Sequence, residues 1–153
     1  MATLATRPAD VLIRGRKVVG GVVEGEALVT RQTISGWGGV NPMKGEIIEM
    51  RHELRGQSFA GKILVFPGAK GSSGWSAMFH TTRLTGQAPI GMLYNITTTK
   101  AALGAVVMRV PTMTDFDSDP LEQIETGDWV RIDADAAVVS VWKGGQPSPE
   151  GIG

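Results

Sequence analysis

Two adjacent serines, Ser72 and Ser73, stand between glycines in the run PGAKGSSGW, where an apolar stretch gives way to a helix-like stretch. Their hydroxyl groups can donate or accept hydrogen bonds, and one could act as a base if neighbouring groups stabilised the deprotonated oxygen. The glycines permit positive φ angles and close approach of a ligand to the backbone. Lys70 adds a positive charge. The run therefore offers the parts of an anion-binding or proton-abstracting site.

The same residues also fit a simpler role in starting a helix. The first amide groups of a helix lack internal partners, so they favour an anion, but a serine side chain satisfies them equally well. The run is not a P-loop, because the P-loop lysine follows the last glycine and Lys70 precedes Gly71. An anion site and a plain helix cap by Ser72 or Ser73 both stay open.

The elements around this run form an alternating pattern. Three apolar runs of strand length are each expected to be buried on both faces, and they are separated by two amphipathic or capped helices. The expected order is strand 61–66, helix 75–84, strand 89–95, a short helix from Thr97 or Thr98 to near Gly104, and strand 106–111 stopped by Pro111. Such a pattern predicts right-handed crossovers and a parallel sheet, whose strand-to-helix loops are where ligands bind.

The two ends of the chain predict a second, β-rich half. Strands are expected over 11–19 and 25–30, and the runs GDWVRID and AAVVSVW predict a hairpin near the C-terminus. We therefore expect an α/β fold: one β/β/α domain over residues 1–153, with a β-barrel-like half beside a parallel β/α layer. Its core would span about 11–142, and 143–153 would form a flexible tail.

Composition excludes several classes of function. Fifteen basic and fifteen acidic residues cancel, so nothing favours nucleic acid or an anionic membrane surface. The absence of cysteine excludes disulfides, thiol nucleophiles and any thiolate-held metal or cluster within this chain. No run approaches the ~20 apolar residues of a membrane span. We expect a cytoplasmic protein with no bound metal of its own.

A second glycine-rich run, SGWGGVNP, could close over the serines with Gly38 and Gly39 exposing their amides, or could be a surface turn. His80 is expected to pack or to face a partner, and His52 to be solvated. Asn95 is expected to serve a cap or turn, with substrate contact as the alternative.

The acidic run TDFDSDP resembles a calcium loop only superficially. It lacks the glycine and the distal glutamate of an EF-hand, and Pro120 interrupts it. We expect a turn over these residues.

Four segments, EGEALVT, ISGWGGVNPMKGEII, GQSFAGKILVFPGAKGSSGWS and GAVVMRVP, together resemble the small subunit of aconitase X. They follow in family order and spacing, and the resemblance covers about residues 11–141. It implies a swivelling β/β/α fold and a heteromeric hydro-lyase that is active only with a large, cysteine-bearing subunit. That partner would hold an iron–sulfur cluster or another metal, which fits a chain without cysteine.

The resemblance also assigns roles to individual residues. Ser72 would be the base that removes the substrate's proton, and Ser73 would donate a hydrogen bond to a substrate carboxylate or to the loop. The other substrate-binding residues it implies are Lys70, Gly71, Gly38, Gly39 and Val40.

One position departs from the related aconitases, which place an arginine directly after the serine pair. Here that position is Gly74. A substrate carboxylate must therefore find its cation elsewhere, on Lys70, on Arg83 or on the partner subunit.

Two substrates compete within the family: cis-3-hydroxy-L-proline, dehydrated to a pyrroline-2-carboxylate, and 5-phosphomevalonate. A phosphate should bring extra basic residues, and only Lys70 adjoins the serines, so the sequence favours hydroxyproline. A non-catalytic module that binds a ligand or partner predicts the same fold.

Overall fold

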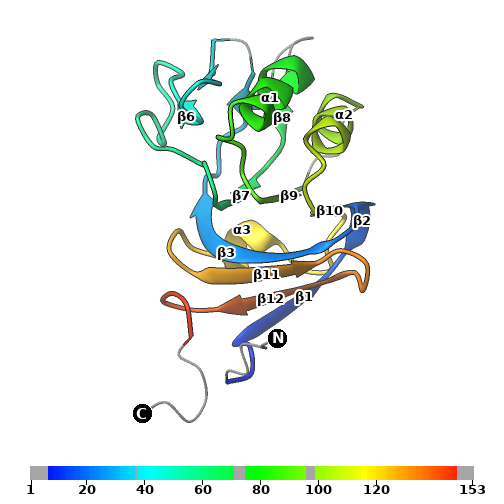
Figure 1. The fold of residues 1–153 in the computed structure, drawn as a ribbon. Helices are drawn as coiled ribbons and strands as arrows, with labels where there is room; N and C mark the ends of the chain where they lie inside the picture. The colour runs from blue at the N-terminus through cyan, green and yellow to red at the C-terminus, as the bar shows by residue number, and fades with distance from the viewer. Residues whose placement is uncertain (1–6, 37, 71–74, 96–98, 148–153) are drawn as a thin grey trace.

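The computed structural model describes residues 7–36, 38–70, 75–95 and 99–147, with side chains from residue 104 onward in the last range. Its centre is a strongly curved eight-stranded mixed sheet (Figure 1). The order of strands across the sheet is β1 (Val11–Arg14), β12 (Val138–Trp142), β11 (Trp129–Asp133), β3 (Val22–Val29), β7 (Ile63–Phe66), β9 (Gly91–Tyr94), β10 (Thr112–Thr114) and β2 (Arg16–Val19).

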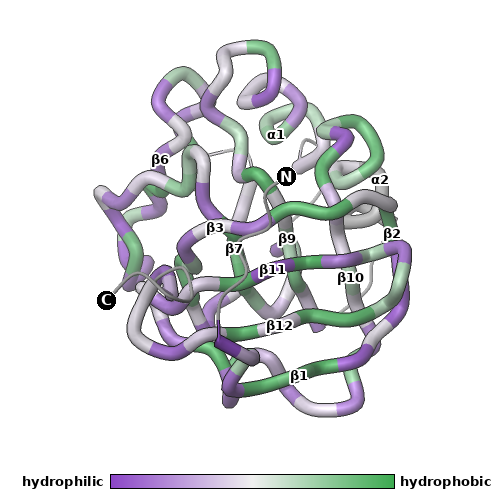
Figure 2. The backbone as a smooth tube through the Cα atoms, turned by 60° about the horizontal axis from the view of Figure 1, so that its bottom comes forward, coloured by the Kyte–Doolittle hydropathy of each residue, from purple (hydrophilic) through white to green (hydrophobic). Residues whose placement is uncertain are grey.

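The antiparallel half contains β1, β12, β11 and the first part of β3, which lie side by side in Figure 2. In β11, Val130 and Ile132 are buried while their neighbours are partly exposed, which is the alternation of a strand with one core face. The predicted hairpin near the C-terminus is confirmed, with β11 and β12 paired from Trp129↔Trp142 to Asp133↔Val138.

The parallel half runs through β3, β7, β9 and β10. Every residue of β7 and of β9 is buried, because core clusters cover both faces of the sheet. The predicted parallel sheet is therefore confirmed. Helices α1 (Trp75–Leu84) and α2 (Thr99–Met108) pack against each other on one face of this half (Figure 1), and α1 has the predicted bounds.

The predicted position of the third parallel strand is wrong. We expected a strand over 106–111, but α2 continues through Met108, and β10 begins only after Pro111. Gly104, predicted to end the helix, lies inside it against Trp75. The helix instead ends at Met108, and Arg109 follows it with a φ of 59°, the left-handed conformation common after a helix.

One chain segment supplies both edges of the sheet. β1 pairs with β12, β2 pairs with β10, and only Gly15 separates the two edge strands. A β carbon on Gly15 would lie 2.7 Å from Cδ1 of Phe116 and 2.8 Å from the carbonyl oxygen of Thr114. The corner therefore needs glycine, and the bend there gives the sheet its nearly barrel-like form.

Smaller elements complete the domain. A lobe beside α1 contains two two-stranded sheets: β4 (Ile34–Ser35) with β8 (Ala69–Lys70), and β5 (Val40–Asn41) with β6 (Glu46–Ile47). The short helix α3 (Pro120–Gln123) is capped by Asp119, whose carboxylate accepts the amide of Leu121. The acidic run before it forms a turn as predicted, with Asp115 paired to Arg16.

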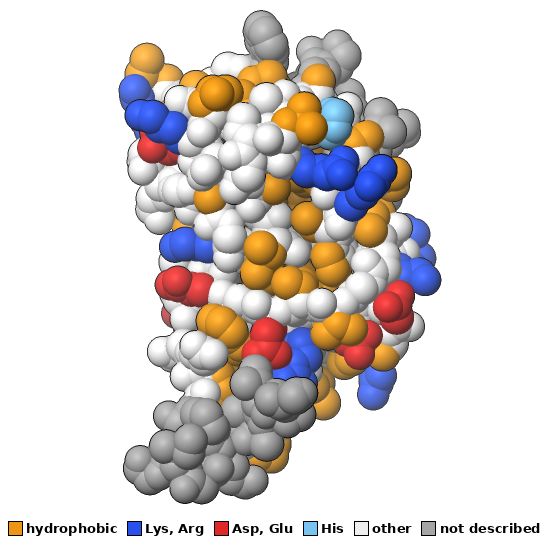
Figure 3. Space-filling model, in the orientation of Figure 1, with side chains coloured by type: hydrophobic (Ala, Val, Ile, Leu, Met, Phe, Trp, Pro, Cys, Tyr) orange, Lys and Arg blue, Asp and Glu red, His pale blue; other side chains and the backbone are white. Residues whose placement is uncertain are grey.

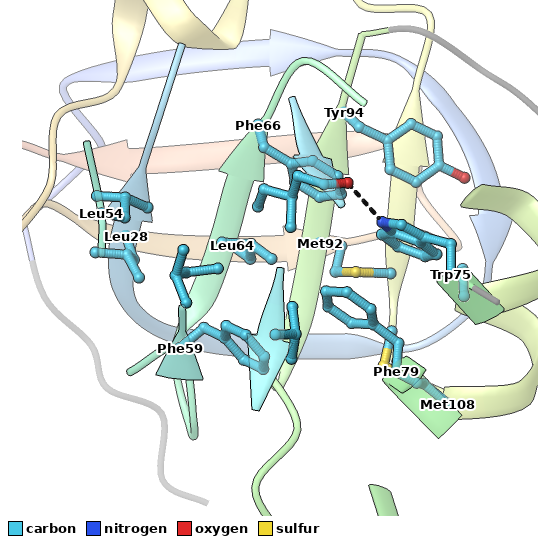
Figure 4. Packing of buried hydrophobic residues seen from close by; sticks show 14 residues of the cluster. Leu28, Leu54, Phe59, Leu64, Phe66, Trp75, Phe79, Met92, Tyr94 and Met108 are labelled. Carbon is cyan, nitrogen blue, oxygen red and sulfur yellow. Dashed lines mark hydrogen bonds between the residues drawn. The ribbon is translucent and has the colours of Figure 1, made fainter. Parts of the chain in front are cut away.

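Aromatic rings dominate the core between the sheet and the helices (Figure 4). Trp75 stacks on Phe79 with ring centres 4.2 Å apart, and Phe79 stacks on Phe59 at 5.4 Å. The indole of Trp75 also packs near Phe66 and donates a hydrogen bond to the carbonyl of Ile34 at 2.9 Å. This contact ties the start of α1 to β4.

Candidate active site at the carboxyl edge of the parallel sheet

The described elements on either side of the serine run frame the place in the chain where it stands. The strand β7 ends at Phe66, β8 ends at Lys70, and α1 begins at Trp75. Gly71, Ser72, Ser73 and Gly74 lie outside the described residues, as do Thr97 and Thr98, so the predicted roles of these residues stay predictions. The structure describes the residues on either side of the run, Lys70 before it and Trp75 after it, which we call the frame of the site.

The far side of that frame is held by Trp75. Its side chain is only 1% exposed and is fixed by the stack on Phe79 and by the hydrogen bond to Ile34. A large buried aromatic with a satisfied N–H is a strong anchor, because both its apolar surface and its polar atom are matched. The N-terminus of α1 is thereby fixed relative to the sheet.

The near side carries an ion pair that the sequence did not indicate. The ammonium of Lys70 donates to Oε2 of Glu49, and Oε1 of Glu49 accepts the backbone amide of Ser35 at 3.4 Å. Burial raises the pKa of Glu49, but the hydrogen bond and charge of Lys70 and the Ser35 amide outweigh it and hold that pKa below its usual value. Lys70, predicted to bind substrate, is thus already paired with a carboxylate.

The strands that precede the two glycine-rich runs lie side by side. β4 and β8 pair in parallel with Ser35 opposite Lys70, so the residues that follow each strand start from neighbouring positions. Gly38 is exposed with a φ of 79°. The amides of Gly39 and Val40 both donate to the carbonyl of Gly36, so these two amides have partners within the turn.

The three residues of this run differ in burial. The side chain of Val40 is in the core below α1. Gly39 is buried, and a β carbon there would lie 2.8 Å from that of Ser35. Trp37 lies outside the described residues. The predicted substrate contacts of Gly38, Gly39 and Val40 stay predictions.

Of the two cations proposed for the missing arginine, Lys70 is the one beside the serine run. Arg83 is in the last turn of α1, eight residues from Trp75, which corresponds to about 12 Å along a helix. Its guanidinium donates to the carbonyl of Val107 on α2.

His52 is not solvated as predicted. Its side chain is only 5% exposed, its Nδ1 accepts the amide of Leu54 at 3.1 Å, and its Nε2 lies 3.2 Å from the carbonyl of Thr33. Because an amide donates to Nδ1, the proton of the neutral ring is on Nε2, which donates to Thr33. The polar neighbours of His52 in the sequence suggested exposure, but the turn folds back onto residues 30–35.

Asn95, directly after β9, has structural partners. Asn95 donates from Nδ2 to Oδ1 of Asp119 at 3.0 Å, and its amide donates to the carbonyl of Pro67. This links the exits of β7 and β9 to the cap of α3, which is the turn role expected for Asn95.

Tyr94 is a buried residue that the sequence gave no reason to single out. Its side chain is fully buried next to Phe66, and its hydroxyl, which points away from Phe66 in Figure 4, has no hydrogen-bond partner among the described residues. Burial raises the pKa of Tyr94 to about 12, with Asp115 adding to the effect and Arg16 opposing it.

The described residues do not form a metal site. No group of three or more histidine, aspartate or glutamate side chains in the described ranges is placed to hold an ion, and the sequence has no cysteine. An iron–sulfur cluster or other metal therefore does not fit this part of the chain. Acidic and basic side chains are both spread over the face shown in Figure 3. None of the described helices is long and apolar enough to cross a membrane.

With the curved mixed sheet and the two packed helices described, the chain can be compared with known families. The model for the aconitase X swivel domain matches residues 12–141. This chain belongs to the aconitase X swivel domain family. The resemblance drawn from the four sequence segments is thereby confirmed, and so is the swivel fold.

Relatives of this aconitase X swivel domain agree over nearly their whole length. The chain is 37% identical to the phosphomevalonate dehydratase small subunit of Thermococcus kodakarensis, covering 88% of this chain and 98% of the relative. It is 39% identical to the protein of that name from Thermococcus gammatolerans, covering 86% and 98%. The crystal structure of Thermococcus kodakaraensis aconitase X in its holo form superposes with a TM-score of 0.82 at 37% identity, covering 87% of this chain and 99% of that chain.

Proposed function

We propose that this chain is the small subunit of an aconitase X-type dehydratase that acts together with a large subunit, and that its substrate is 5-phosphomevalonate. The observation that carries this proposal is the match of 37–39% identity, over 98% of their length, to small subunits named phosphomevalonate dehydratase. These names favour phosphomevalonate over the hydroxyproline that the sequence alone led us to prefer.

In the proposed reaction, Ser72 in its alkoxide form removes a proton from the substrate carbon adjacent to the carbon that bears the leaving hydroxyl. The electrons of the C–H bond form the new double bond, and the C–O bond breaks. The departing hydroxide takes a proton from an acid held outside this chain and leaves as water. The small subunit supplies the base, and the large subunit supplies the group that assists departure.

A serine hydroxyl is a weak acid, so its alkoxide needs stabilisation by donors arranged in advance. The described frame supports such an arrangement. The first amides of a helix have no partner within the helix and favour negative charge, and Trp75 fixes that end of α1 in the core. Lys70 adds a cation two residues before Ser72.

The second candidate substrate is cis-3-hydroxy-L-proline. The observation that favours it is the Lys70–Glu49 pair. Lys70 is the described cation nearest to Ser72 along the chain, and its charge is already matched, so this chain adds little net positive charge for a phosphate there. A hydroxyproline carries its own ammonium group beside its carboxylate, so it requires less positive charge from the protein.

The test is to reconstitute the complex with its large subunit and to assay both substrates. We expect Ser72→Ala to lower kcat by about 10³-fold, as loss of a catalytic base does, with subunit assembly unchanged by gel filtration. Ser76→Ala, on α1 and beyond the serine run, is the matched control and should keep wild-type turnover.

The outcomes separate the candidates. Turnover of phosphomevalonate by the wild-type complex supports the proposal, whereas turnover of hydroxyproline alone assigns the second substrate. Full activity of the Ser72→Ala complex would show that Ser72 is not the base, and this chain would then be a module that binds a ligand or partner without performing chemistry.

A further inference from the structure

A turn that follows β6 is joined to the chain around β4 by a series of side-chain hydrogen bonds. Oε2 of Glu53 accepts the hydroxyl of Thr30 and the amide of Arg31, the latter at 3.0 Å. His52 bonds to Thr33, as described above. Glu49 completes the series at the other end of the turn, where it reaches Ser35. The turn 49–54 is therefore held along residues 30–35 at several points.

The Glu49 carboxylate joins both strands of the small parallel sheet. One oxygen accepts the amide of Ser35 on β4, and the other accepts the ammonium of Lys70 on β8, directly opposite Ser35 in the strand register. A carboxylate that also accepts a backbone amide is oriented by the backbone, whereas the long lysine side chain has more rotatable bonds with which to adapt. The lysine must come to it, so its position is set by the backbone.

The exposure of the two side chains also indicates that Glu49 positions Lys70 and not the reverse. The side chain of Glu49 is 23% exposed, whereas that of Lys70 is 47% exposed, so the carboxylate is the fixed partner and the ammonium is the accessible one. An ammonium has three N–H donors, and Glu49 accepts from Lys70 through a single oxygen. Donors on the exposed side of Lys70 therefore stay available to an anion.

We propose that Glu49 is a positioning residue that holds the Lys70 ammonium at the edge of the active site before substrate arrives. Lys70 then binds the anionic group of the substrate with its remaining donors while still paired. Ordering the long lysine side chain in advance removes part of the entropy cost that binding would otherwise carry. This inference rests on the proposed function, since it requires an anionic substrate at the serine run.

The kinetic test is a double-mutant cycle in the reconstituted complex. We expect Glu49→Gln, which keeps the shape and removes the charge, to raise KM about fivefold with kcat within about twofold of wild type, because ground-state binding is lost. Lys70→Met should raise KM further. The double variant should match Lys70→Met alone, because Glu49 acts only through Lys70.

Glu24→Gln is the matched control. Glu24 is 22% exposed and also has two contacts, with Nε of Arg131 at 2.8 Å and Nε1 of Trp129 at 3.0 Å, but it lies on β3 in the antiparallel half. A general effect of losing a half-buried carboxylate would appear in both variants. An effect on KM through Lys70 appears only in Glu49→Gln.

A second measurement does not depend on activity. In the full chain, the rate of acylation of Lys70 by an amine-directed reagent, followed by peptide mass spectrometry, should rise in Glu49→Gln and stay at the wild-type rate in Glu24→Gln. An unchanged labelling rate overturns the inference, and so does a KM that stays the same or falls in Glu49→Gln, since a fall would make Glu49 a competitor for Lys70. If the wild-type complex dehydrates neither substrate, the proposed function fails, and labelling still decides whether Glu49 holds Lys70.

Discussion

Gly104 lies against the indole ring of Trp75 so closely that a β carbon at that position would stand 2.7 Å from Cε3 of the ring and closer still to Cζ3. Both distances are shorter than a normal van der Waals contact between carbon atoms. The close packing of α1 on α2 therefore requires glycine at position 104. Because Trp75 begins the helix that follows the serine run, this contact joins helix packing to the candidate site.

The first prediction concerns that contact. Gly104→Ala should destabilise the fold by about 1–3 kcal/mol, because the added methyl overfills a packed interface and outweighs the better helix propensity of alanine. Urea unfolding followed by tryptophan fluorescence measures it. Val106→Ala, on an exposed position of the same helix, is the control and should change stability little. Wild-type stability in Gly104→Ala would show that the helices can separate without cost.

The second prediction concerns Asp128, which is buried and binds Lys143 and the amide of Gly144. Burial raises the pKa of Asp128, but the bond to Lys143 and the amides of Glu125 and Gly144 outweigh it and hold the pKa below the ordinary value of 3.8. A lowered pKa in the folded state stabilises the protein above that ordinary value, and this contribution is lost as pH falls through the lowered value.

Asp128→Asn should therefore cost about 1–3 kcal/mol at neutral pH, because a buried carboxylate that accepts three hydrogen bonds loses its charge while solvent still reaches Lys143. The difference from wild type should shrink as the pH falls below 3.8, where the unfolded carboxylate takes up a proton, and should continue to shrink until the pH passes the lowered pKa of the folded state. Chemical denaturation at a series of pH values measures both. A difference that does not vary with pH would contradict the argument, and Asp133→Asn, at a partly exposed position on β11, serves as control.

The third prediction uses the only tyrosine in the chain. Because the buried hydroxyl of Tyr94 has no partner among the described residues, Tyr94→Phe should stabilise the protein by about 1 kcal/mol at neutral pH, since it removes an unmatched polar group. Thermal unfolding measures the gain. A loss of stability would mean that the hydroxyl does have a partner.

Tyr94 also predicts a sensitivity to alkali. Its pKa rises from 10.0 to about 12 on folding, so the unfolded chain loses the phenolic proton first. Stability from this group is complete below pH 10.0 and is lost as the pH rises toward 12, by about 2–3 kcal/mol in all. Phenolate absorbance reports Tyr94 alone, and Tyr94→Phe should lack this loss. Titration of the folded protein near 10.0 would refute the burial argument.

Local patterns in the sequence were enough to predict several elements of the fold. The apolar run of β7, the spacing of Trp75 and Phe79 on α1, and the two-run hairpin of β11 and β12 each depend on residues close together in the chain. The end of α2 could not be read in this way. Gly104 has the sequence signature of a helix end, but its role is set by Trp75, 29 positions earlier.

The candidate site shows the same division. The serine run and Lys70 were identified from the sequence, but the partner of Lys70 was not, because Glu49 lies 21 residues away and meets it only through the β4–β8 pairing. His52 was assigned to solvent for the same reason, since Thr33 covers it from another segment. Side-chain contacts between distant segments cannot be predicted from the local patterns of a single sequence.

The bend at Gly15 has a consequence for the integrity of the whole sheet. Since β1 and β2 come from one short segment, proteolytic loss of that segment would bare two borders at once, along β12 and along β10. Unpaired strands rich in valine and threonine are templates for aggregation. The strands β1 and β2 thus close both borders of the sheet, and a chain trimmed of them would be expected to aggregate.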